Sequence, residues 1–458
     1  MGTTDLLFMF CAFAMREALL FAACGFLLLG ASDLAVDLVW IGRTLRRRLG
    51  GRMICADSLP PARRPGAIAI FLPAWDEGAV IGSMLRASLD RFGEGDYRIF
   101  VGAYPNDPAT IDAVQSVRDE RIRLIVGPVP GKTTKADCLN RLWEALLEEE
   151  RRTGRPFKAV VLHDAEDLVH PAELRIFDRL VEQHDLVQLP VLPLVDRASW
   201  VSKTYADEFA ESHGKELVVR QALGASIPSA GVGCAFSRSA LAMIAEQNGG
   251  NPFAADSLSE DYELGLKLHA AGARAIFVRL RSAPGGAVVA TREYFPGTIR
   301  EAVAQKSRWM VGIALAGWDR LGWSGGLAER WMRLRDRQSL LAAILICAAY
   351  LSLLLWGMLQ ARALVTGIPL EPVGEPLRLL LLLNLALLAW RLAMRCAFVT
   401  RAYGWREGLA SVPRIVLANL IAIWSAQRAV YRYLILRRTG RTSWDKTAHR
   451  FPAEIPAE

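Results

Sequence analysis

The chain has 458 residues, of which 52% are hydrophobic, and a formal net charge of +8 at pH 7. It is too apolar for a purely soluble enzyme and long enough for one sizeable domain plus membrane segments. The arginines gather beside apolar runs, as at Arg46–Arg48, which is typical of the inner flanks of membrane helices rather than of a nucleic-acid stripe. We therefore expect a membrane protein without a nucleic-acid partner. Its seven cysteines show no CxxC pairing and are expected to be free thiols.

The first segment, residues 1–43, is predicted to be a membrane region. Residues 17–41 are long enough to span a bilayer, and neither a basic start nor an A-x-A site indicates a cleaved signal peptide. Asp33 and Asp37 lie one helical turn apart and so share one face. Acids at membrane depth are costly, so they are expected to face protein, water or the cytoplasmic interface, and they either mark the wet inner end of the helix or have a functional role.

Residues 44–325 are predicted to form an α/β domain. After a linker that ends near Gly66, short β-branched runs alternate with amphipathic segments of helical period. The predicted strands are 67–72, 97–103, 121–126 and 159–162, and the predicted helices are 79–92, 136–151 and 172–183. This alternation predicts βαβ units and a mostly parallel, Rossmann-like sheet.

Polar side chains follow three of these strands where each strand ends. They are Pro73, Ala74 and Glu77 after the first strand, Asp107 after the second, and Asp164, Glu166 and Asp167 after the fourth. Ends of parallel strands meet at one edge, where open α/β sheets bind ligands. Crowded carboxylates repel one another unless a divalent cation neutralises them, and oxygen ligands suit Mg²⁺ or Mn²⁺. The alternative is a solvated acidic turn that caps the next helix.

Two glycine-containing stretches between the motifs are candidates for binding loops. The run Gly131-Lys132-Thr133 is not a P-loop, because the preceding glycine, Gly127, is one residue too close. We instead expect this loop to place a basic group, Lys132 or Lys135, near a diphosphate. Residues 231–236 include Gly233 and Cys234 and form a small-residue run where a substrate could approach the backbone closely.

Two further motifs are expected on helices. Ser259-Glu260-Asp261 opens a predicted helix at 262–271, where Ser259 also suits a plain N-cap and the acids suit the helix dipole. Gln305, Arg308 and Trp309 stand at i, i+3 and i+4 of a predicted helix at 298–315, so they share one face. A polar, cationic and aromatic triplet on one face is unusual for packing alone.

Residues 326–458 are predicted to form a second membrane region. Spans are expected at 339–359 and 377–398, an interfacial helix at 412–427, and a basic tail beyond it. Three spans place the N-terminus outside, the α/β domain and the tail in the cytoplasm, and loop 360–376 outside. This topology puts every arginine cluster on the cytoplasmic side.

These motifs, in this order, resemble processive-type family 2 glycosyltransferases, the group that includes cellulose and hyaluronan synthases. The resemblance covers about Ala67 to Trp309 and the flanking membrane helices. Asp164-Ala165-Glu166 stands in the D-x-D place, Ser259-Glu260-Asp261 in the TED place, and Gln305, Arg308 and Trp309 as QxxRW. More narrowly, HDAEDLVHP and the terminal WDKTAH resemble NfrB, the inner-membrane glycosyltransferase group of a phage receptor system. That group continues into a regulatory domain that binds a cyclic dinucleotide, which we expect this chain to lack because its sequence stops just after Pro452.

The resemblance implies a GT-A fold and inversion at the anomeric carbon. It also implies a UDP-sugar donor, among which UDP-N-acetylhexosamine is favoured, and a divalent metal ion, Mg²⁺ or Mn²⁺. Asp164 would hold the metal, completed by either Glu166 or Asp167. Asp261 would be the general base beside Glu260, and Arg308 would stabilise the leaving diphosphate. The implied nucleotide-binding residues are Pro73, Ala74, Glu77, Asp107, Lys135 and Asp164. The implied acceptor-binding residues are Trp309, Gln305, Gly233 and Cys234.

The resemblance also implies a bacterial inner-membrane location, with a growing glycan or lipid-linked acceptor. Because three spans are few for a translocation channel, we expect an outer-membrane or periplasmic export partner, or a homo-oligomer. Two other classes compete with this reading. One is a catalytically inactive glycosyltransferase fold that serves as a receptor scaffold. The other is a metal-dependent phosphohydrolase that uses His163, Asp164 and His170.

Overall fold

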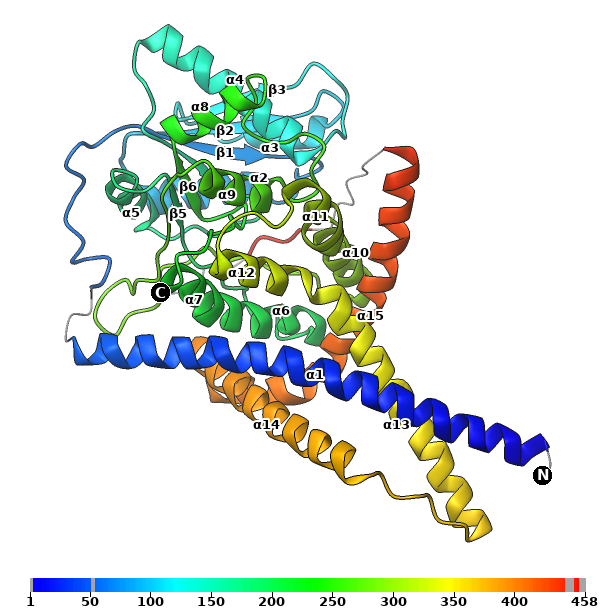
Figure 1. Cartoon of the computed structure of the whole chain (residues 1–458). Coiled ribbons are helices and arrows are strands. Elements are labelled where there is room, and N and C mark those ends of the chain that lie inside the picture. Colours follow the sequence, from blue (N-terminus) through cyan, green and yellow to red (C-terminus); the bar gives the residue numbers. More distant parts are fainter. Residues whose placement is uncertain (1–2, 51–53, 441–448, 453–458) are drawn as a thin grey trace.

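The α/β domain is built on one seven-stranded sheet (Figure 1). The computed structural model describes residues 3–50, 54–440 and 449–452, so residues 444–448 of the terminal motif lie outside the described residues. The strand order is β3-β2-β1-β4-β6-β5-β7, and all pairs are parallel except those of β6. The strands are β1 (Ile68–Pro73), β2 (Tyr97–Ala103), β3 (Ile122–Val126), β4 (Ala159–Leu162), β5 (Leu186–Gln188), β6 (Cys234–Ser237) and β7 (Ala275–Phe277). The predicted α/β class with a mostly parallel sheet is confirmed.

The centre of the sheet is buried on both faces because β1 and β4 are apolar and buried at every position. Side chains alternate along a strand, so Ile70 of β1 packs into one core cluster and the neighbouring Phe71 into a second cluster. The first cluster includes residues of α2 (Ile81–Phe92) and α5 (Glu173–Leu180), and the second includes residues of α4 (Lys135–Thr153) and α8 (Arg238–Gln247). The sheet therefore holds its strand ends, where the polar motifs begin, on a rigid support.

The remaining helices of the domain are α3 (Pro108–Gln115), α6 (Trp200–Glu211), α7 (Leu217–Ala222), α9 (Glu260–Ala270), α10 (Ile299–Met310), α11 (Ala316–Leu321) and α12 (Leu327–Arg337). Helix α3 packs against β2 and β3 and α9 against α8, whereas α6, α7, α10 and α12 lie toward the membrane helices (Figure 1). Two π-helical turns, η1 (Ser212–Glu216) and η2 (Val311–Leu315), interrupt this set. Such turns are rare and often stand at functional sites.

Four helices are long and apolar enough to cross a membrane, by length and composition: α1 (Thr3–Leu49), α13 (Ser339–Thr366), α14 (Glu375–Tyr403) and α15 (Trp405–Thr439). They support a membrane protein. The expected interfacial helix at 412–427 is wrong in extent, because Pro413 lies inside one helix of 35 residues. The three-span topology therefore counts one candidate helix too few.

Asp33 and Asp37 of α1 face protein, which settles the question that the sequence left open. The Asp37 carboxylate lies 2.6 Å from the ammonium of Lys215 in η1 and accepts a hydrogen bond of 2.8 Å from the indole of Trp390 in α14. Asp33 pairs with Arg335 of α12 at 2.9 Å. Both acids therefore fasten the first membrane helix to the α/β domain and its neighbours.

Candidate active site

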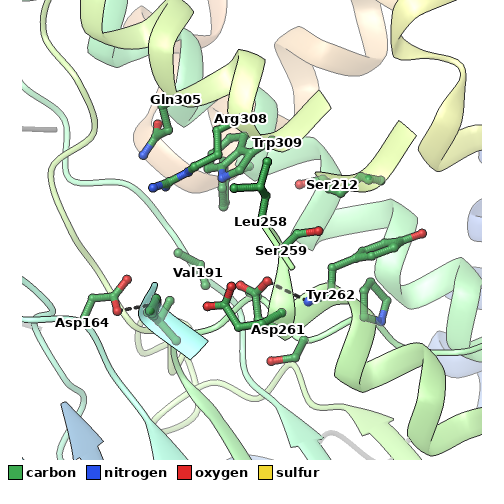
Figure 2. A pocket seen from close by; sticks show the side chains of 18 of the residues that line it. Asp164, Val191, Ser212, Leu258, Ser259, Asp261, Tyr262, Gln305, Arg308 and Trp309 are labelled. Carbon is green, nitrogen blue, oxygen red and sulfur yellow. Dashed lines mark hydrogen bonds and ion pairs between the residues drawn. The ribbon is translucent and has the colours of Figure 1, made fainter. Parts of the chain in front are cut away.

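A cavity of about 490 Å³ opens beside the carboxyl ends of the parallel strands. Of the residues that the sequence singled out, those that line it are Pro73, Glu77, Lys135, Asp164, Glu166, Glu260, Asp261, Gln305, Arg308 and Trp309. Figure 2 shows Asp261 near the middle, Asp164 on one side, and Gln305, Arg308 and Trp309 together above them. Three motifs separated by up to 145 positions along the chain therefore share one cavity, whose size suits a ligand site.

Asp167 does not line this cavity, although the sequence left it open as a metal ligand. Its carboxylate lies 2.8 Å from Nδ1 of the fully buried His163, whose Nε2 lies 3.1 Å from Glu173. Burial opposes the charge on His163, but Glu173 and Asp167 outweigh it and raise the pKa of this imidazole to about 10. The geometry therefore favours Glu166 over Asp167 beside Asp164. It also removes His163 from the phosphohydrolase arrangement.

Asp107 and Ala74, predicted to bind the nucleotide, lie outside the residues that line the cavity. Asp107 instead caps α3, because its Oδ1 accepts a hydrogen bond from the backbone N–H of Thr110. Its Oδ2 accepts a second bond of 2.5 Å from the backbone N–H of Asp76, which has a positive φ of 55°. Asp107 thus shapes the loop after β1 rather than facing the cavity.

Gly233 and Cys234, predicted to bind the acceptor, also lie elsewhere. Cys234 begins the antiparallel strand β6 and is fully buried, with its thiol 3.2 Å from the Ser229 hydroxyl. Gly233 has a φ of +56°, and a Cβ there would come within 2.3 Å of the Thr291 hydroxyl. The small residues of this run therefore serve close packing of the sheet, which the sequence alone did not distinguish from substrate access.

Lys135 is the central cation on the strand-end side of the cavity. It stands at the first turn of α4, which Thr134 caps, and its ammonium lies 2.5 Å from Asp164. Burial opposes its charge, but Asp164, Glu260 and Asp261 outweigh burial and raise its pKa. The charged lysine thus connects the acidic end of β4 with the acidic start of α9.

Glu166 belongs to a group of potential metal ligands that the sequence did not reveal. Ligand atoms of Glu77, Glu166 and His449 lie within 4.8 Å of one another. The His449 Nδ1 atom is 2.8 Å from Glu77 and 3.2 Å from Glu166. Burial, with Asp164, Glu77 and Asp167 nearby, raises the pKa of Glu166 to about 8 although His449 opposes the shift. Buried oxygens with one imidazole nitrogen fit a divalent cation such as Mg²⁺ or Mn²⁺.

Glu260 and Asp261 begin α9 in the middle of the cavity. Burial and the neighbouring Asp261 charge raise the pKa of Glu260 to about 7, and burial also raises the pKa of Asp261. One Asp261 oxygen accepts a hydrogen bond of 2.7 Å from the backbone N–H of Tyr262. The other lies where a Cβ on Gly231, whose φ is +75°, would meet it at 2.3 Å. Glycine at 231 thus makes room for this carboxylate.

Several cavity residues escaped the sequence reasoning. Glu293 carries no motif of its own, and His449 stands at the end of WDKTAH, which was used only for the resemblance. The wall beyond Asp261 adds Ser212, Glu216, Arg220, Tyr262, Arg335 and Asp336. Ser212 and Glu216 lie in η1, which no sequence pattern reveals, and Arg335 belongs to an arginine-rich stretch just before the apolar run at 339–359, where arginines were expected to flank a membrane helix.

Comparisons with known proteins agree with this fold. A solved mannosyltransferase from Pyrobaculum calidifontis, in complex with GDP-Man and Mn²⁺, superposes with a TM-score of 0.54 at 17% identity, covering 92% of this chain and 99% of the other. Bacteriophage adsorption protein B of Escherichia coli K12 and bacteriophage N4 adsorption protein B of Escherichia coli O157:H7 are each 38% identical over 93% of this chain. The chain spans 60% of the length of both relatives.

The family comparison covers the part of the chain that builds the cavity. A model described as glycosyltransferase-like family 2 matches residues 65–312, which include β1 to β7, α9 and α10. All three motifs around Asp164, Asp261 and Trp309 fall inside that range. The match spans more than half of the chain, and with the NfrB-type relatives and the shared fold it shows that this chain belongs to glycosyltransferase-like family 2.

Proposed function

We propose that this chain is an inverting glycosyltransferase of a bacterial inner membrane, which transfers a sugar from a UDP-sugar to a growing glycan for surface or secreted polysaccharide. The observation that carries the proposal is the position of Asp261. It lies beside the acidic strand end at Asp164 and below the face of α10 that presents Trp309 (Figure 2). A general base in that place has the proposed donor site on the side of Asp164 and the proposed acceptor site on the side of Trp309.

The residues divide the transfer between them. The acceptor hydroxyl attacks the anomeric carbon from the face opposite the diphosphate, which inverts that centre. Asp261 accepts the hydroxyl proton as the new C–O bond forms and the bond to the diphosphate oxygen breaks. Lys135 and Arg308, both on the cavity wall, stabilise the negative charge that collects on the departing UDP. Trp309 offers a flat apolar face to the acceptor sugar.

Asp164 and Glu166, with Glu77 and His449 beside Glu166, would hold a divalent cation. When bound, such a cation supplies positive charge against the diphosphate. The acids support this assignment. Among the described residues on the strand-end side of the cavity, the cationic groups are Lys135, Arg308 and His449, and they are outnumbered by the acids Glu77, Asp164, Glu166, Glu260, Asp261 and Glu293. An anionic nucleotide would be repelled from such a surface without added positive charge.

The deciding experiment measures UDP release by the purified chain from a panel of UDP-sugars, with GDP-Man as a comparison donor, with and without Mn²⁺. We expect Mn²⁺-dependent UDP release from at least one UDP-sugar. Asp164→Ala should lose both the Mn²⁺ dependence and the affinity for UDP. The exposed Asp112→Asn on α3 is the matched control.

Three outcomes would contradict parts of the proposal. Release from GDP-Man alone would overturn the UDP assignment. Unchanged calorimetric binding of UDP to Asp164→Ala in Mn²⁺ would overturn the metal assignment. No release from any donor, with intact UDP binding, would favour a catalytically inactive scaffold.

A further inference from the structure

Two membrane helices and strand β7 meet at one junction around η1. The rings of Trp40 in α1 and Phe398 in α14 lie 4.9 Å apart between centroids. The Trp40 indole donates a hydrogen bond of 3.2 Å to the backbone carbonyl of Gly214 in η1. The adjacent His213 ring lies 5.9 Å from the ring of Phe277 in β7. Side chains of α1, α14 and β7 are therefore held together through η1.

Three arginines stand at this junction, one from each of α1, α14 and the end of β7. The Arg401 guanidinium, in the last turn of α14, lies over the Trp40 ring, 5.8 Å from its centroid. Arg43 follows Trp40 by three residues and so lies on the same face of α1. Arg279 follows Phe277 by two residues, just beyond the end of β7. We call Arg43, Arg279 and Arg401 the junction arginines, and they do not line the active-site cavity.

The junction arginines have no acidic partner among the described residues, where no carboxylate forms an ion pair with any of the three. Burial and the charges of Arg401 and Arg281 lower the pKa of Arg279 to about 10, and no acid opposes this shift. The Arg43 Nε atom is buried and has no hydrogen-bond partner in the described part of the chain. Enclosed cations without partners are costly, so an anion bound at the junction would stabilise them.

Other arginines on this side of the membrane region are paired with acids. Arg335 lies 2.9 Å from one oxygen of Asp33, and Arg391 of α14 pairs with the other oxygen of the same carboxylate. Arg395, one turn further along α14, lies 3.3 Å from Glu211. The pairing stops at the last turn of α14, where an anion from outside the chain would take the place of the carboxylate.

The surface beside the junction arginines has the character of a lipid–water interface. Leu38, Leu45 and Leu49 of α1 are each more than half exposed, although they share the helix end with Arg46–Arg48. Residues 38–56 contain no aspartate or glutamate. Exposed leucines, several arginines and a tryptophan on one helix end are typical of a segment that lies at the membrane surface. Basic pockets between membrane helices bind the phosphates of lipid headgroups.

We propose that the junction arginines bind the phosphate of an anionic phospholipid, which fastens the end of β7 to α1 and α14. The inference goes beyond the proposed function and does not depend on it. Guanidinium groups suit this ligand because each offers its N–H donors in a planar fork that matches two phosphate oxygens. A free phosphate ion would use the same donors, but it would leave the exposed leucines beside them uncovered.

The test is calorimetric binding to the full chain in neutral maltoside micelles. The probe is dihexanoyl phosphatidylglycerol, compared with dihexanoyl phosphatidylcholine and with inorganic phosphate. We expect phosphatidylglycerol to bind the wild type about tenfold more tightly than either comparison ligand. Arg279→Gln should weaken that binding about tenfold, the scale of one hydrogen bond to a charged group. Arg118→Gln, at an exposed arginine beyond α3, is the matched control and should bind like the wild type.

Thermal unfolding separates a lipid site from a structural role. Arg279→Gln removes an enclosed cation that has no acidic partner in the described residues, so without phosphatidylglycerol it should melt no earlier than the wild type. Phosphatidylglycerol should then raise the melting temperature of the wild type more than that of the variant. A variant that melts earlier without lipid, yet binds phosphatidylglycerol as the wild type does, would show a structural arginine and overturn the proposal.

A second variant, Arg401→Gln, repeats the test at an exposed position and decides it if Arg279→Gln does not fold. It should also weaken phosphatidylglycerol about tenfold. Binding by both variants equal to that of the wild type would overturn the site. Equal affinity of the wild type for phosphatidylglycerol and inorganic phosphate, or for phosphatidylglycerol and phosphatidylcholine, would overturn the assignment to an anionic lipid.

Discussion

Lys135 and Lys215 are both enclosed ammonium groups among carboxylates, yet their surroundings differ. Lys215 is 3% exposed and has two acids in contact, Asp37 at 2.6 Å and Glu211 at 2.7 Å, and Arg395 shares Glu211 at 3.3 Å. Charges in that group nearly cancel. Among the described residues, Lys135 forms an ion pair with Asp164 alone, while Glu260 and Asp261 act on it from a distance and further acids line the same wall.

The difference separates a structural ion pair from a ligand site. Buried charges that cancel one another need nothing more and can join two elements, here α1 and η1. An unbalanced group of acids is costly in the free protein and is stabilised when a cation or a cationic complex binds. Net charge of the enclosed group, rather than the presence of buried charge, therefore marks the candidate active site.

The largest expected effect tests whether the acids around Lys135 take part in chemistry. Asp261→Asn removes the proposed proton acceptor but keeps the shape, so transfer should fall by about 10²–10⁴-fold. UDP-sugar binding should stay within a few-fold of wild type, since the donor contacts lie on the other side. Single-turnover transfer and calorimetric UDP binding are the two measurements. Retained turnover would remove Asp261 as the base.

A change at Lys215 should instead act on stability. Lys215→Met leaves Asp37 and Glu211 buried without their ammonium partner, a loss of about 3–5 kcal/mol in the free energy of unfolding. Chemical denaturation of the detergent-solubilised protein measures it. Lys135→Met is the matched comparison, and it should weaken UDP binding while changing the unfolding free energy less. Equal loss of unfolding free energy in both variants would show that Lys135, like Lys215, has a structural role.

Trp309 is expected to show a smaller effect on the acceptor side. Its ring lines the cavity and meets Tyr205 edge-on at 6.0 Å between centroids. Trp309→Ala should cost about 1–3 kcal/mol of transition-state binding, and Phe should restore much of it because a flat face remains. Slow hydrolysis of the UDP-sugar by water should persist in both variants. A parallel loss of hydrolysis and transfer would indicate a packing role instead.

The smallest effect is a shift in pH dependence. Burial raises the pKa of Asp261, so the active carboxylate exists only above that raised pKa, and transfer should decline as pH falls through it. Glu260→Gln removes a neighbouring acid and should move this acid limb of kcat/KM to lower pH. The comparison variant is Glu263→Gln. Glu263 lies about one helical turn after Glu260 on α9 and pairs with Arg320 at 2.9 Å. An unmoved limb would assign it to another group.

The parts of the molecule predicted from sequence are those governed by local pattern. Tyr97–Ala103 and Ala159–Leu162 form strands with the predicted bounds, because short β-branched runs between turns have few alternatives. Strand β6 was missed because it is only four residues long, Cys234 to Ser237, and directly follows a glycine-containing run. Whether such a run serves packing or access depends on what lies against it, here Thr291 and the sheet.

Site residues could be predicted from sequence where they belong to a local motif of reactive side chains. They could not be predicted where the site depends on a contact between residues that are distant in sequence. Asp164, Asp261 and Trp309 line the cavity as expected, since their motifs follow a strand end or occupy one helix face. The choice between Glu166 and Asp167 depended on His163, a buried partner four residues from Asp167. His449 meets Glu77 across 372 positions of sequence, and no local pattern reveals such a contact.

Helix α1 also sets a rule for how the chain can vary in length. Its 47 residues extend about 70 Å at 1.5 Å per residue, more than twice the roughly 30 Å of bilayer hydrocarbon. Each inserted residue rotates the part of the helix on one side of it by about 100° relative to the other side. One extra residue before Asp33 would therefore rotate the N-terminal half of α1 relative to the half that carries Asp33 and Asp37, and the N-terminal half would present a different face to its neighbours. Insertions of about seven residues, close to two full turns, restore the phase. Homologues that differ in this helix should therefore differ by such steps.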